Sequence, residues 1–191
     1  MNPLEAAGTA LGLLNLWLTR QQNILCWPVG IACVLCFAFV FHEARLYSDM
    51  LLQYVYVGLQ AWGWWLWARG GRDRLVSRSP IRKLSRMTFL VCLAVCAAVA
   101  FLLGNLMATA TRADLPYLDA TATAGSLIAQ YLQAKKVLES WLIFCAANLV
   151  FIGIYLAKGL YLTAALFVAS TMLALSGYLT WRQRLEATAG R

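Results

Sequence analysis

Residues 46–67 read LYSDMLLQYVYVGLQAWGWWLW, and residues 160–181 read LYLTAALFVASTMLALSGYLTW. The two stretches end a longer match in which residues 4–67 align with residues 118–181 without a gap, with 16 identities over 64 positions. Three of these identities pair Trp27 with Trp141, Gly63 with Gly177 and Trp67 with Trp181. A gap-free duplication of this length predicts two structurally equivalent units, and paired units in membrane proteins commonly flank one substrate path.

The composition is typical of an integral membrane protein. Of the 191 residues, 62% are hydrophobic and 13% are charged, and the mean hydropathy is +0.67, which is more apolar than a soluble chain of this size. No segment shows the period-two alternation of a barrel strand, so we expect an all-α protein with seven transmembrane helices. The apolar segments, each close to the ~20 residues that cross the hydrocarbon core, cover residues 4–19, 27–44, 46–67, 88–107, 118–134, 139–157 and 160–181.

The duplication divides the seven helices into a 3+1+3 arrangement within a single transmembrane domain, residues 1–191. Repeat one covers residues 4–67, the connecting helix and its loops cover residues 68–117, and repeat two covers residues 118–181. Because the connecting helix is a single span, it returns the chain to the face on which it started. The two three-helix repeats are therefore predicted to be parallel.

The net charge of +8 comes from basic residues in the loops and predicts membrane topology rather than nucleic-acid binding. If residues 69–86 are cytoplasmic, thirteen Lys and Arg residues lie inside and three lie outside. This asymmetry predicts an external N-terminus and a cytoplasmic C-terminus. The inner group is Arg20, the seven basic residues of 69–86, Lys135, Lys136, Arg182, Arg184 and Arg191, and the outer group is Arg45, Arg112 and Lys158.

Polar side chains follow helical spacing inside three of the apolar segments. Because each polar group is costly in lipid, these faces are expected to point toward the bundle interior or a water-filled cavity. The faces consist of Asp49, Gln53, Tyr56 and Gln60 on the third segment, Asp119, Thr123, Ser126, Gln130 and Gln133 on the fifth, and Trp141, Phe144, Asn148 and Tyr155 on the sixth.

This mixture of amides, hydroxyls and aromatic planes suits a flat polar ligand. Aromatic faces stack on a planar ring and attract a cationic one, while amides and hydroxyls pair with heteroatoms. The alternative is that the same residues pack helices together or lie in the interfacial aromatic belt. The predicted substrate-binding residues are Trp141, Phe144, Asn148, Gln53, Tyr56, Gln60, Thr123, Ser126 and Gln130.

Other chemistries find little support in the sequence. The segments show no HExxH or GxSxG motif and no catalytic dyad, so neither an enzyme nor a cofactor is expected. The cysteine pairs Cys33/Cys36 and Cys92/Cys96 lie within apolar helices and predict core residues rather than a metal site. No relay of carboxylates or histidines occurs deep in the membrane, because His42 is predicted to lie at an outer loop. The sequence therefore favours a uniporter.

The sequence resembles the PnuC family of vitamin-precursor transporters over nearly its whole length. In the first half the resemblance depends on Gln22-Asn23, Trp27-Pro28-Val29-Gly30, Leu46-Tyr47-Ser48-Asp49, Leu52-Gln53 and residues 63–67. In the second half it depends on Leu115-Pro116-Tyr117-Leu118-Asp119-Ala120, Glu139-Ser140-Trp141, Asn148, Lys158-Gly159-Leu160-Tyr161-Leu162-Thr163 and Gly177-Tyr178.

The resemblance implies facilitated diffusion of nicotinamide riboside across the bacterial inner membrane, followed by trapping by a cytoplasmic kinase. It also implies a homo-oligomer, a trimer, embedded in membrane lipid. Thiamine, riboflavin and deoxynucleosides are alternative substrates within the family, and a seven-helix vitamin sensor is a further alternative. The family signature Trp-x-x-Trp-x-x-x-Asn reads Trp141, Phe144 and Asn148 here, so phenylalanine replaces the second tryptophan. Phenylalanine keeps a stacking face but lacks the indole N–H donor.

Overall fold

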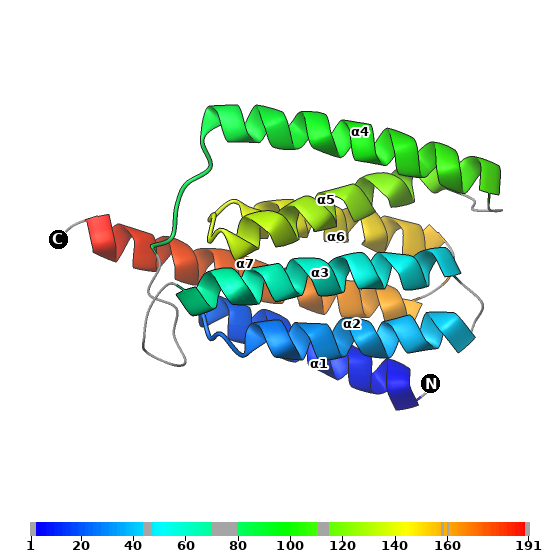
Figure 1. Ribbon diagram of the computed structural model, residues 1–191, viewed down its shortest axis with the longest axis horizontal. Coiled ribbons are helices and arrows are strands. Elements are labelled where there is room, and N and C mark those ends of the chain that lie inside the picture. The colour runs from blue at the N-terminus through cyan, green and yellow to red at the C-terminus, as the bar shows by residue number, and fades with distance from the viewer. Residues whose placement is uncertain are drawn as a thin grey trace. The chain divides into compact units, whose positions relative to one another are not determined.

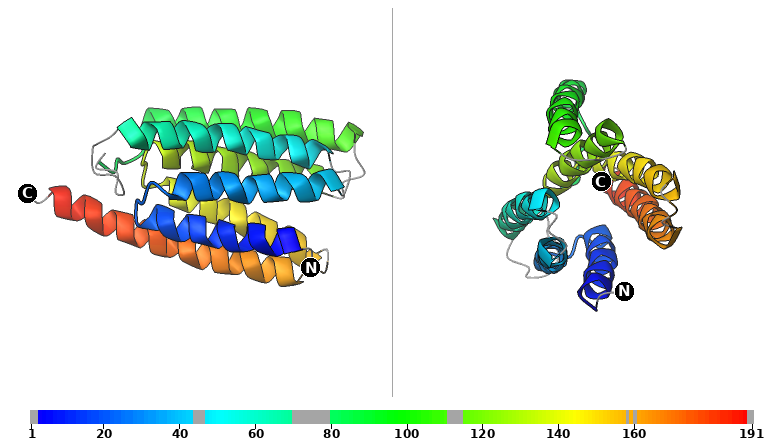
Figure 2. Two further views of the ribbon diagram at one scale, coloured as in Figure 1. Left: turned by 60° about the horizontal axis from the view of Figure 1, so that its bottom comes forward. Right: turned by 90° about the vertical axis from the view of Figure 1, so that its right-hand side faces the viewer.

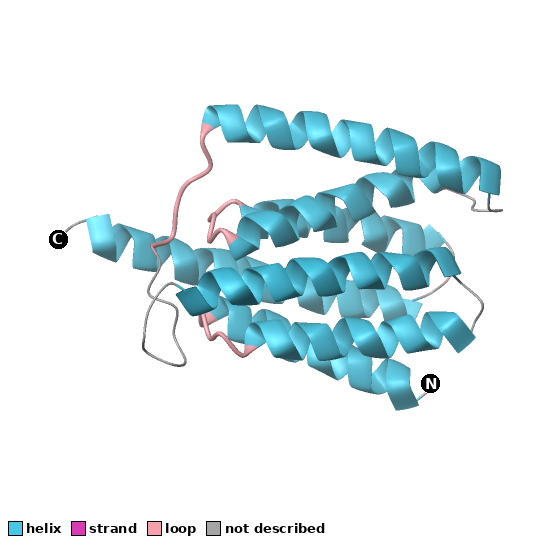
Figure 3. Ribbon diagram, in the orientation of Figure 1, coloured by secondary structure: helices cyan, strands magenta, loops and turns pink. Residues whose placement is uncertain are grey.

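The described part of the chain folds into seven α-helices, which confirms the predicted all-α fold (Figure 1). The computed structural model describes residues 3–43, 47–69, 80–110, 115–157, 159 and 161–189. Outside the helices the described chain consists of loops and turns with isolated bridge residues, among them Arg82 paired with Val137 (Figure 3). The helices are α1 (Pro3–Arg20), α2 (Cys26–Glu43), α3 (Tyr47–Arg69), α4 (Arg86–Ala110), α5 (Pro116–Ala134), α6 (Ser140–Ala157) and α7 (Tyr161–Ala189).

Most helix ends lie within three residues of the predicted apolar segments, but α7 continues to Ala189 instead of ending at residue 181. Its last turns are made of residues that favour helix, and Arg182 and Glu186 form an i, i+4 ion pair with a 2.9 Å Nε–Oε1 distance. The apolar pattern marks the membrane-buried part of the helix. It does not mark where helical backbone ends, because charged residues continue the helix into water.

Four of the described helices, α2, α4, α6 and α7, are long and apolar enough to cross a membrane. The other three lack an apolar stretch of that length, and two of them, α3 and α5, carry the polar faces noted in the sequence. Large apolar side chains of α4 are exposed, among them Phe101 and Leu102 at 65% and 67%. Such a surface is stable against lipid and not against water, so the chain is a multi-pass membrane protein.

The chain forms two compact units, residues 1–80 and 81–191. In the first unit α2 packs against both α1 and α3. In the second unit the contacts follow chain order, with α4 on α5, α5 on α6 and α6 on α7 (Figure 2). The 3+1+3 layout and the single domain remain predictions.

The first two helices of each repeat are joined by the same turn. Gln22 and Lys136, at equivalent positions, both adopt a left-handed conformation, with φ of 59° and 54°. In the first turn the amides of Gln22 and Asn23 donate to the carbonyls of Thr19 and Leu18, and in the second those of Lys136 and Val137 donate to Gln133 and Leu132. Each turn therefore caps its helix with a Schellman motif. The duplication seen in the sequence thus extends to individual backbone hydrogen bonds.

A tryptophan packed on a glycine joins two helices in each unit. The ring of Trp27 in α2 lies on Gly63 of α3 and meets Trp67 edge to face, with a centroid distance of 5.2 Å and an interplanar angle of 87°. In the second unit Trp141 of α6 lies on Gly177 of α7 and meets Trp181 at 5.4 Å and 90°. We call these two arrangements the Trp–Gly–Trp contacts. All four tryptophans are almost fully buried.

Small residues also bring α1 onto α2. A Cβ atom added at Gly8 would lie 3.0 Å from the Phe37 ring, and one added at Gly12 would lie 3.5 Å from Cys33 Sγ. The Cys33 thiol donates to the Gly8 carbonyl, with an Sγ–O distance of 3.2 Å. The Gly8-x-x-x-Gly12 face is thus used for packing within the chain.

Alanine at either glycine of the Trp–Gly–Trp contacts should destabilise the protein. A Cβ at Gly63 would lie 2.2 Å from a Trp27 ring carbon, and one at Gly177 would lie 2.8 Å from Trp141 ring carbons. We expect Gly63→Ala to lower the free energy of unfolding by about 1–3 kcal/mol and Gly177→Ala by less, because overpacking a rigid ring forces the helices apart. Thermal unfolding of the purified protein in detergent measures this.

Gly58→Ala and Gly153→Ala are the matched controls, because a Cβ at either position meets no atom within 4 Å. Both should be neutral or stabilising by up to about 1 kcal/mol, since alanine favours helix more than glycine does. Equal melting temperatures for all four variants would contradict the packing role of the Trp–Gly–Trp contacts.

Candidate functional site

The face of α6 that carries the predicted Trp141 and Asn148 is buried within its unit. Trp141 is 0% exposed because its ring fills the space above Gly177. Its indole N–H makes no hydrogen bond within the described part of the chain. The adjacent Ser140 hydroxyl, also fully buried, is equally unpaired there. Phe144, one turn further, is half-buried.

Asn148 lies two turns after Trp141 on the same face and is 2% exposed. Its side-chain N–H₂ group is buried and has no hydrogen-bond partner among the described residues. An unpaired buried amide donor costs about 1–3 kcal/mol, so proteins rarely keep one without a reason. A ligand carbonyl or hydroxyl at this position would remove the cost.

The polar face of α5 lies partly against α6. Gly125 approaches Ala147 closely enough that an added Cβ would be 3.6 Å from the Ala147 Cβ. The next residue on α5, Ser126, is buried and donates to the Ala122 carbonyl at 2.9 Å, so its hydroxyl is already satisfied within the helix. Thr123 and Gln130 are half-buried. Of the three predicted α5 residues, Ser126 is therefore the least available to a ligand.

In the first unit the structure reveals a pair of side-chain amides, Gln60 and Asn15, of which only Gln60 was predicted as a site residue. Gln60 of α3 is 5% exposed, and a Cβ added at Gly30 of α2 would lie 2.4 Å from its Nε2 and 2.2 Å from the Nδ2 of Asn15 on α1. Gly30 thus leaves room for both amides. Thr19 donates its hydroxyl to the Asn15 carbonyl at 2.8 Å and lies 3.1 Å from Asn15 Oδ1.

Asn15 is missing from the predicted site because spacing along α1 does not show that Gly30 of α2 and Gln60 of α3 lie opposite it. The sequence feature that points to Asn15 is an amide in an apolar helix followed by a glycine, Gly30, in the next helix. The other two predicted residues of α3, Gln53 and Tyr56, are half-buried.

The polar cluster of the first unit has no counterpart in the second. The residues equivalent to Asn15, Gly30 and Gln60 are Ala129, Phe144 and Ala174. Ala129 and Ala174 are 2% and 0% exposed. Two amides facing a glycine are thus exchanged for two alanines and one phenyl ring, so the two repeats differ in polarity at equivalent positions.

Of the nine predicted residues, the structure places three in two buried groups, each inside its own unit. Gln60 joins Asn15 at Gly30 in the first, and Trp141 and Asn148 share one buried face in the second. A single cavity formed by both groups remains a prediction. Among the described residues no three His, Cys, Asp or Glu side chains are grouped so as to hold a metal ion.

A helical multi-pass membrane protein with uncharged aromatic and amide side chains buried in both of its units has the form of a membrane transporter of small polar molecules. Comparison with known proteins identifies the family. The nicotinamide mononucleotide transporter family matches residues 2–183, and the chain belongs to it.

Individual relatives are similar over nearly the whole chain. The nicotinamide riboside transporter PnuC of Escherichia coli (strain K12) is 25% identical over 202 residues, covering 93% of this chain and 84% of that protein. The riboflavin/roseoflavin transporter RibM of Streptomyces davaonensis is 28% identical over 180 residues, covering 93% and 83%. The crystal structure of the vitamin B3 transporter PnuC shares the fold, with a TM-score of 0.78 at 20% identity, over 97% of this chain and 84% of that one.

Asn148→Leu should separate stability from function. Leucine has a similar volume and no unpaired donor, so we expect an equal or higher melting temperature together with at least tenfold weaker uptake of the substrate. Asn105→Leu on α4 is the control, because Asn105 Nδ2 donates to the Phe101 carbonyl at 2.8 Å and its Oδ1 accepts from Tyr117 at 3.1 Å. That variant should lose stability and keep its uptake. Unchanged uptake in Asn148→Leu would remove Asn148 from the site.

The internal repeat supplies a control for Trp141. Trp27 makes the same contacts in the first unit, and both indole N–H groups lack a partner among the described residues. We expect Trp141→Phe and Trp27→Phe to lower the melting temperature by similar amounts, while only Trp141→Phe weakens substrate binding, several-fold. Binding measured by calorimetry on both variants tests this, and equal binding losses would assign Trp141 to packing alone.

Proposed function

We propose that the protein carries nicotinamide riboside by facilitated diffusion across the bacterial inner membrane. The observation that carries this proposal is the buried, unpaired amide of Asn148 on the same face of α6 as Trp141. It occurs in a chain similar to a nicotinamide riboside transporter over 93% of its length. A ligand with a carboxamide or hydroxyl group next to a flat ring satisfies both side chains.

The chemistry of the proposed substrate matches these groups. Its pyridinium ring is planar and positively charged, and an aromatic face attracts such a ring by about 0.5–2 kcal/mol. Its carboxamide and ribose hydroxyls offer partners for the amides of Asn148, Gln60, Gln53 and Gln130, and for Thr123. Phe144 supplies a further stacking face, and Tyr56 and Ser126 complete the proposed lining.

Riboflavin is the second candidate substrate, favoured by the similarity to the riboflavin/roseoflavin transporter RibM. Phe144 also bears on this choice. A phenyl ring stacks on a neutral flavin ring as well as on a pyridinium, but it lacks the stronger cation attraction and the N–H donor of an indole. Thiamine, another cationic planar ring, remains an alternative within the same family.

The proposed mechanism is uniport. Charged groups of the described helices lie toward helix ends: His42 and Glu43 are exposed in the last turn of α2, and Glu139 lies just before α6, where its Oε2 accepts the Leu84 amide at 2.7 Å. None of the proposed substrate-binding residues is charged. Proton or sodium coupling normally uses a buried carboxylate or histidine, so the proposed lining supports diffusion down a gradient.

The proposed setting follows from the charge asymmetry. The N-terminus is external and the C-terminus cytoplasmic, and the two three-helix repeats are parallel with the substrate path between them. A homotrimer and trapping of the substrate by a cytoplasmic kinase complete the proposal.

Flux into liposomes tests the function and the substrate together. Purified protein without any ion gradient should equilibrate labelled nicotinamide riboside, and uptake should stop when inner and outer concentrations are equal. Phe144→Trp should raise the affinity for nicotinamide riboside several-fold, because an indole attracts a cation more strongly and adds an N–H donor. Specific binding without flux would favour a sensor, and flux of riboflavin or thiamine alone would reassign the substrate.

A further inference from the structure

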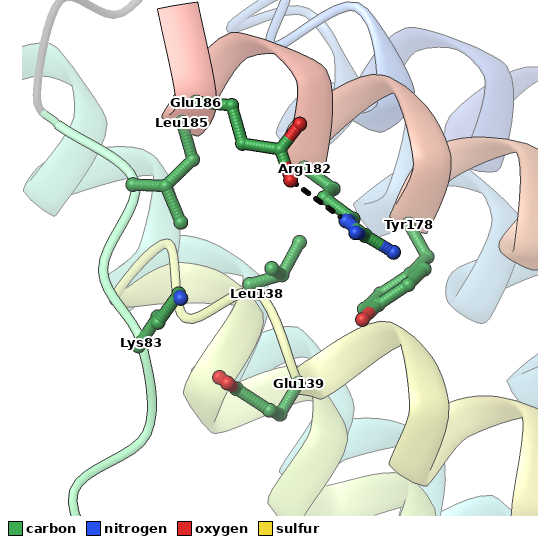
Figure 4. Close-up of a pocket in the computed structure, with 7 residues that line it drawn as sticks. All are labelled: Lys83, Leu138, Glu139, Tyr178, Arg182, Leu185 and Glu186. Carbon is green, nitrogen blue, oxygen red and sulfur yellow. Dashed lines mark hydrogen bonds and ion pairs between the residues drawn. The ribbon is translucent and has the colours of Figure 1, made fainter. Parts of the chain in front are cut away.

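The second unit contains a pocket of about 430 Å³ at the C-terminal end of α7, separate from every proposed substrate-binding residue. Three segments form it: the loop before α4, the residues just before α6 and the last turns of α7 (Figure 4). Its lining consists of Lys83, Leu138, Glu139, Tyr178, Arg182, Leu185 and Glu186.

One wall of the pocket is fixed by hydrogen bonds. The Arg82 amide donates to the Lys136 carbonyl and the Leu138 amide donates to the Arg82 carbonyl, both at 2.9 Å. Glu139 Oε2 accepts the Leu84 amide at 2.7 Å. The Glu139 carboxylate is therefore held in place before any ligand arrives, with lone pairs left to accept further bonds, and such preorganisation lowers the cost of binding.

The opposite wall is more adaptable. Arg182 and Glu186 form a single Nε–Oε1 contact at 2.9 Å, and their side chains are 56% and 62% exposed (Figure 4). An exposed pair of this kind contributes at most about 1 kcal/mol. It leaves the terminal amino groups of Arg182 for another acceptor. Lys83 reaches the pocket from the far side and is also exposed.

The charges select the kind of ligand. Two cations, Lys83 and Arg182, and two carboxylates, Glu139 and Glu186, surround one space. A purely anionic ligand would meet both carboxylates, and a purely cationic ligand would meet both cations. A ligand that carries a phosphate and an ammonium group satisfies all four charges, because guanidinium and ammonium groups bind phosphate and carboxylates accept from an ammonium.

The surroundings favour a lipid as the source of that group. A second hollow of about 450 Å³ shares Glu139 and is lined by Leu84, Ser85, Arg86, Phe89 and Leu90. Phe89 and Leu90 continue into the exposed apolar surface of α4. A polar pocket beside an apolar hollow at the end of membrane-spanning helices fits a headgroup with its acyl chains running along α4.

We propose that this pocket binds a membrane phospholipid whose headgroup carries both a phosphate and a primary ammonium group. The phosphate pairs with Arg182 and Lys83, and the ammonium pairs with Glu139 and Glu186. The lipid joins the chain before α4, the start of α6 and the end of α7 at the membrane surface. This inference goes beyond transport and does not depend on which substrate is carried.

Native mass spectrometry of the full-length protein tests the proposal with four probes: phosphatidylethanolamine, phosphatidylcholine and phosphatidylglycerol with identical acyl chains, and soluble phosphoethanolamine. We expect phosphatidylethanolamine to bind at least fivefold more tightly than the other two lipids, because choline has no N–H donor and glycerol has no cation. The double variant Glu139→Gln/Arg182→Gln should abolish this preference. Glutamine at 139 retains an acceptor for the Leu84 amide, so the wall of the pocket stays formed.

The control variant Glu43→Gln/Arg184→Gln makes the same charge changes at exposed helix positions outside the pocket, and should keep the preference. Equal binding of all three lipids, or a preference that survives the double variant, would overturn the proposal. Soluble phosphoethanolamine that competes as well as the lipid would show a site for a soluble compound instead. Substrate flux into liposomes is measured for the same variants, so that a loss of lipid preference and a loss of transport are observed separately.

Discussion

Each unit depends on the contact of an indole ring with a glycine of the neighbouring helix. Lipid chains are as apolar as helix faces, so helices in a membrane are held by close packing rather than by exclusion of water. Trp27 on Gly63 and Trp141 on Gly177 supply that packing, with a second tryptophan closing the edge of each ring. The contact sets the distance between α2 and α3. It therefore also sets the position of Gln60, one turn before Gly63, against Gly30 of α2.

The two repeats share their turns and helix contacts but differ in the polarity of equivalent side chains. The turns and the Trp–Gly–Trp contacts recur position by position. Asn15, Gly30 and Gln60, by contrast, correspond to Ala129, Phe144 and Ala174. The exchange approximately conserves volume while moving the polar groups to one repeat, which a packed core tolerates. Such exchanges make the two repeats chemically unlike without altering the turns and the Trp–Gly–Trp contacts within each.

The features that could be predicted from the sequence are those that depend on periodicity along one helix. The features that could not be predicted depend on contacts or conformations that periodicity does not record. Apolar length located seven helices, and the duplication of Trp27, Gly63 and Trp67 predicted equivalent units, because each repeats the same local packing. The extra turns of α7 were missed because hydropathy records contact with lipid and not backbone conformation. Asn15 was missed because spacing along one helix shows which face a residue occupies, whereas the atoms opposite that face depend on a second helix. Periodicity also could not show that Ser126 satisfies its own hydroxyl within α5, because spacing gives the face of a side chain and not its rotamer.

The absence of charge from the proposed site determines how the proposed cargo would move. Neutral aromatic and amide groups bind a flat cation through several contacts of about 0.5–2 kcal/mol each, strong enough for entry and weak enough for release. Unpaired donors on Trp141 and Asn148 raise the free energy of the empty site, and a ligand relieves that cost only while it is bound. No ion relay is then needed, since a cationic substrate itself moves with the membrane potential, which contributes about 2.3 kcal/mol per charge for each 100 mV. A buried carboxylate would bind the same cation more tightly and hold it, so a neutral lining favours turnover over retention.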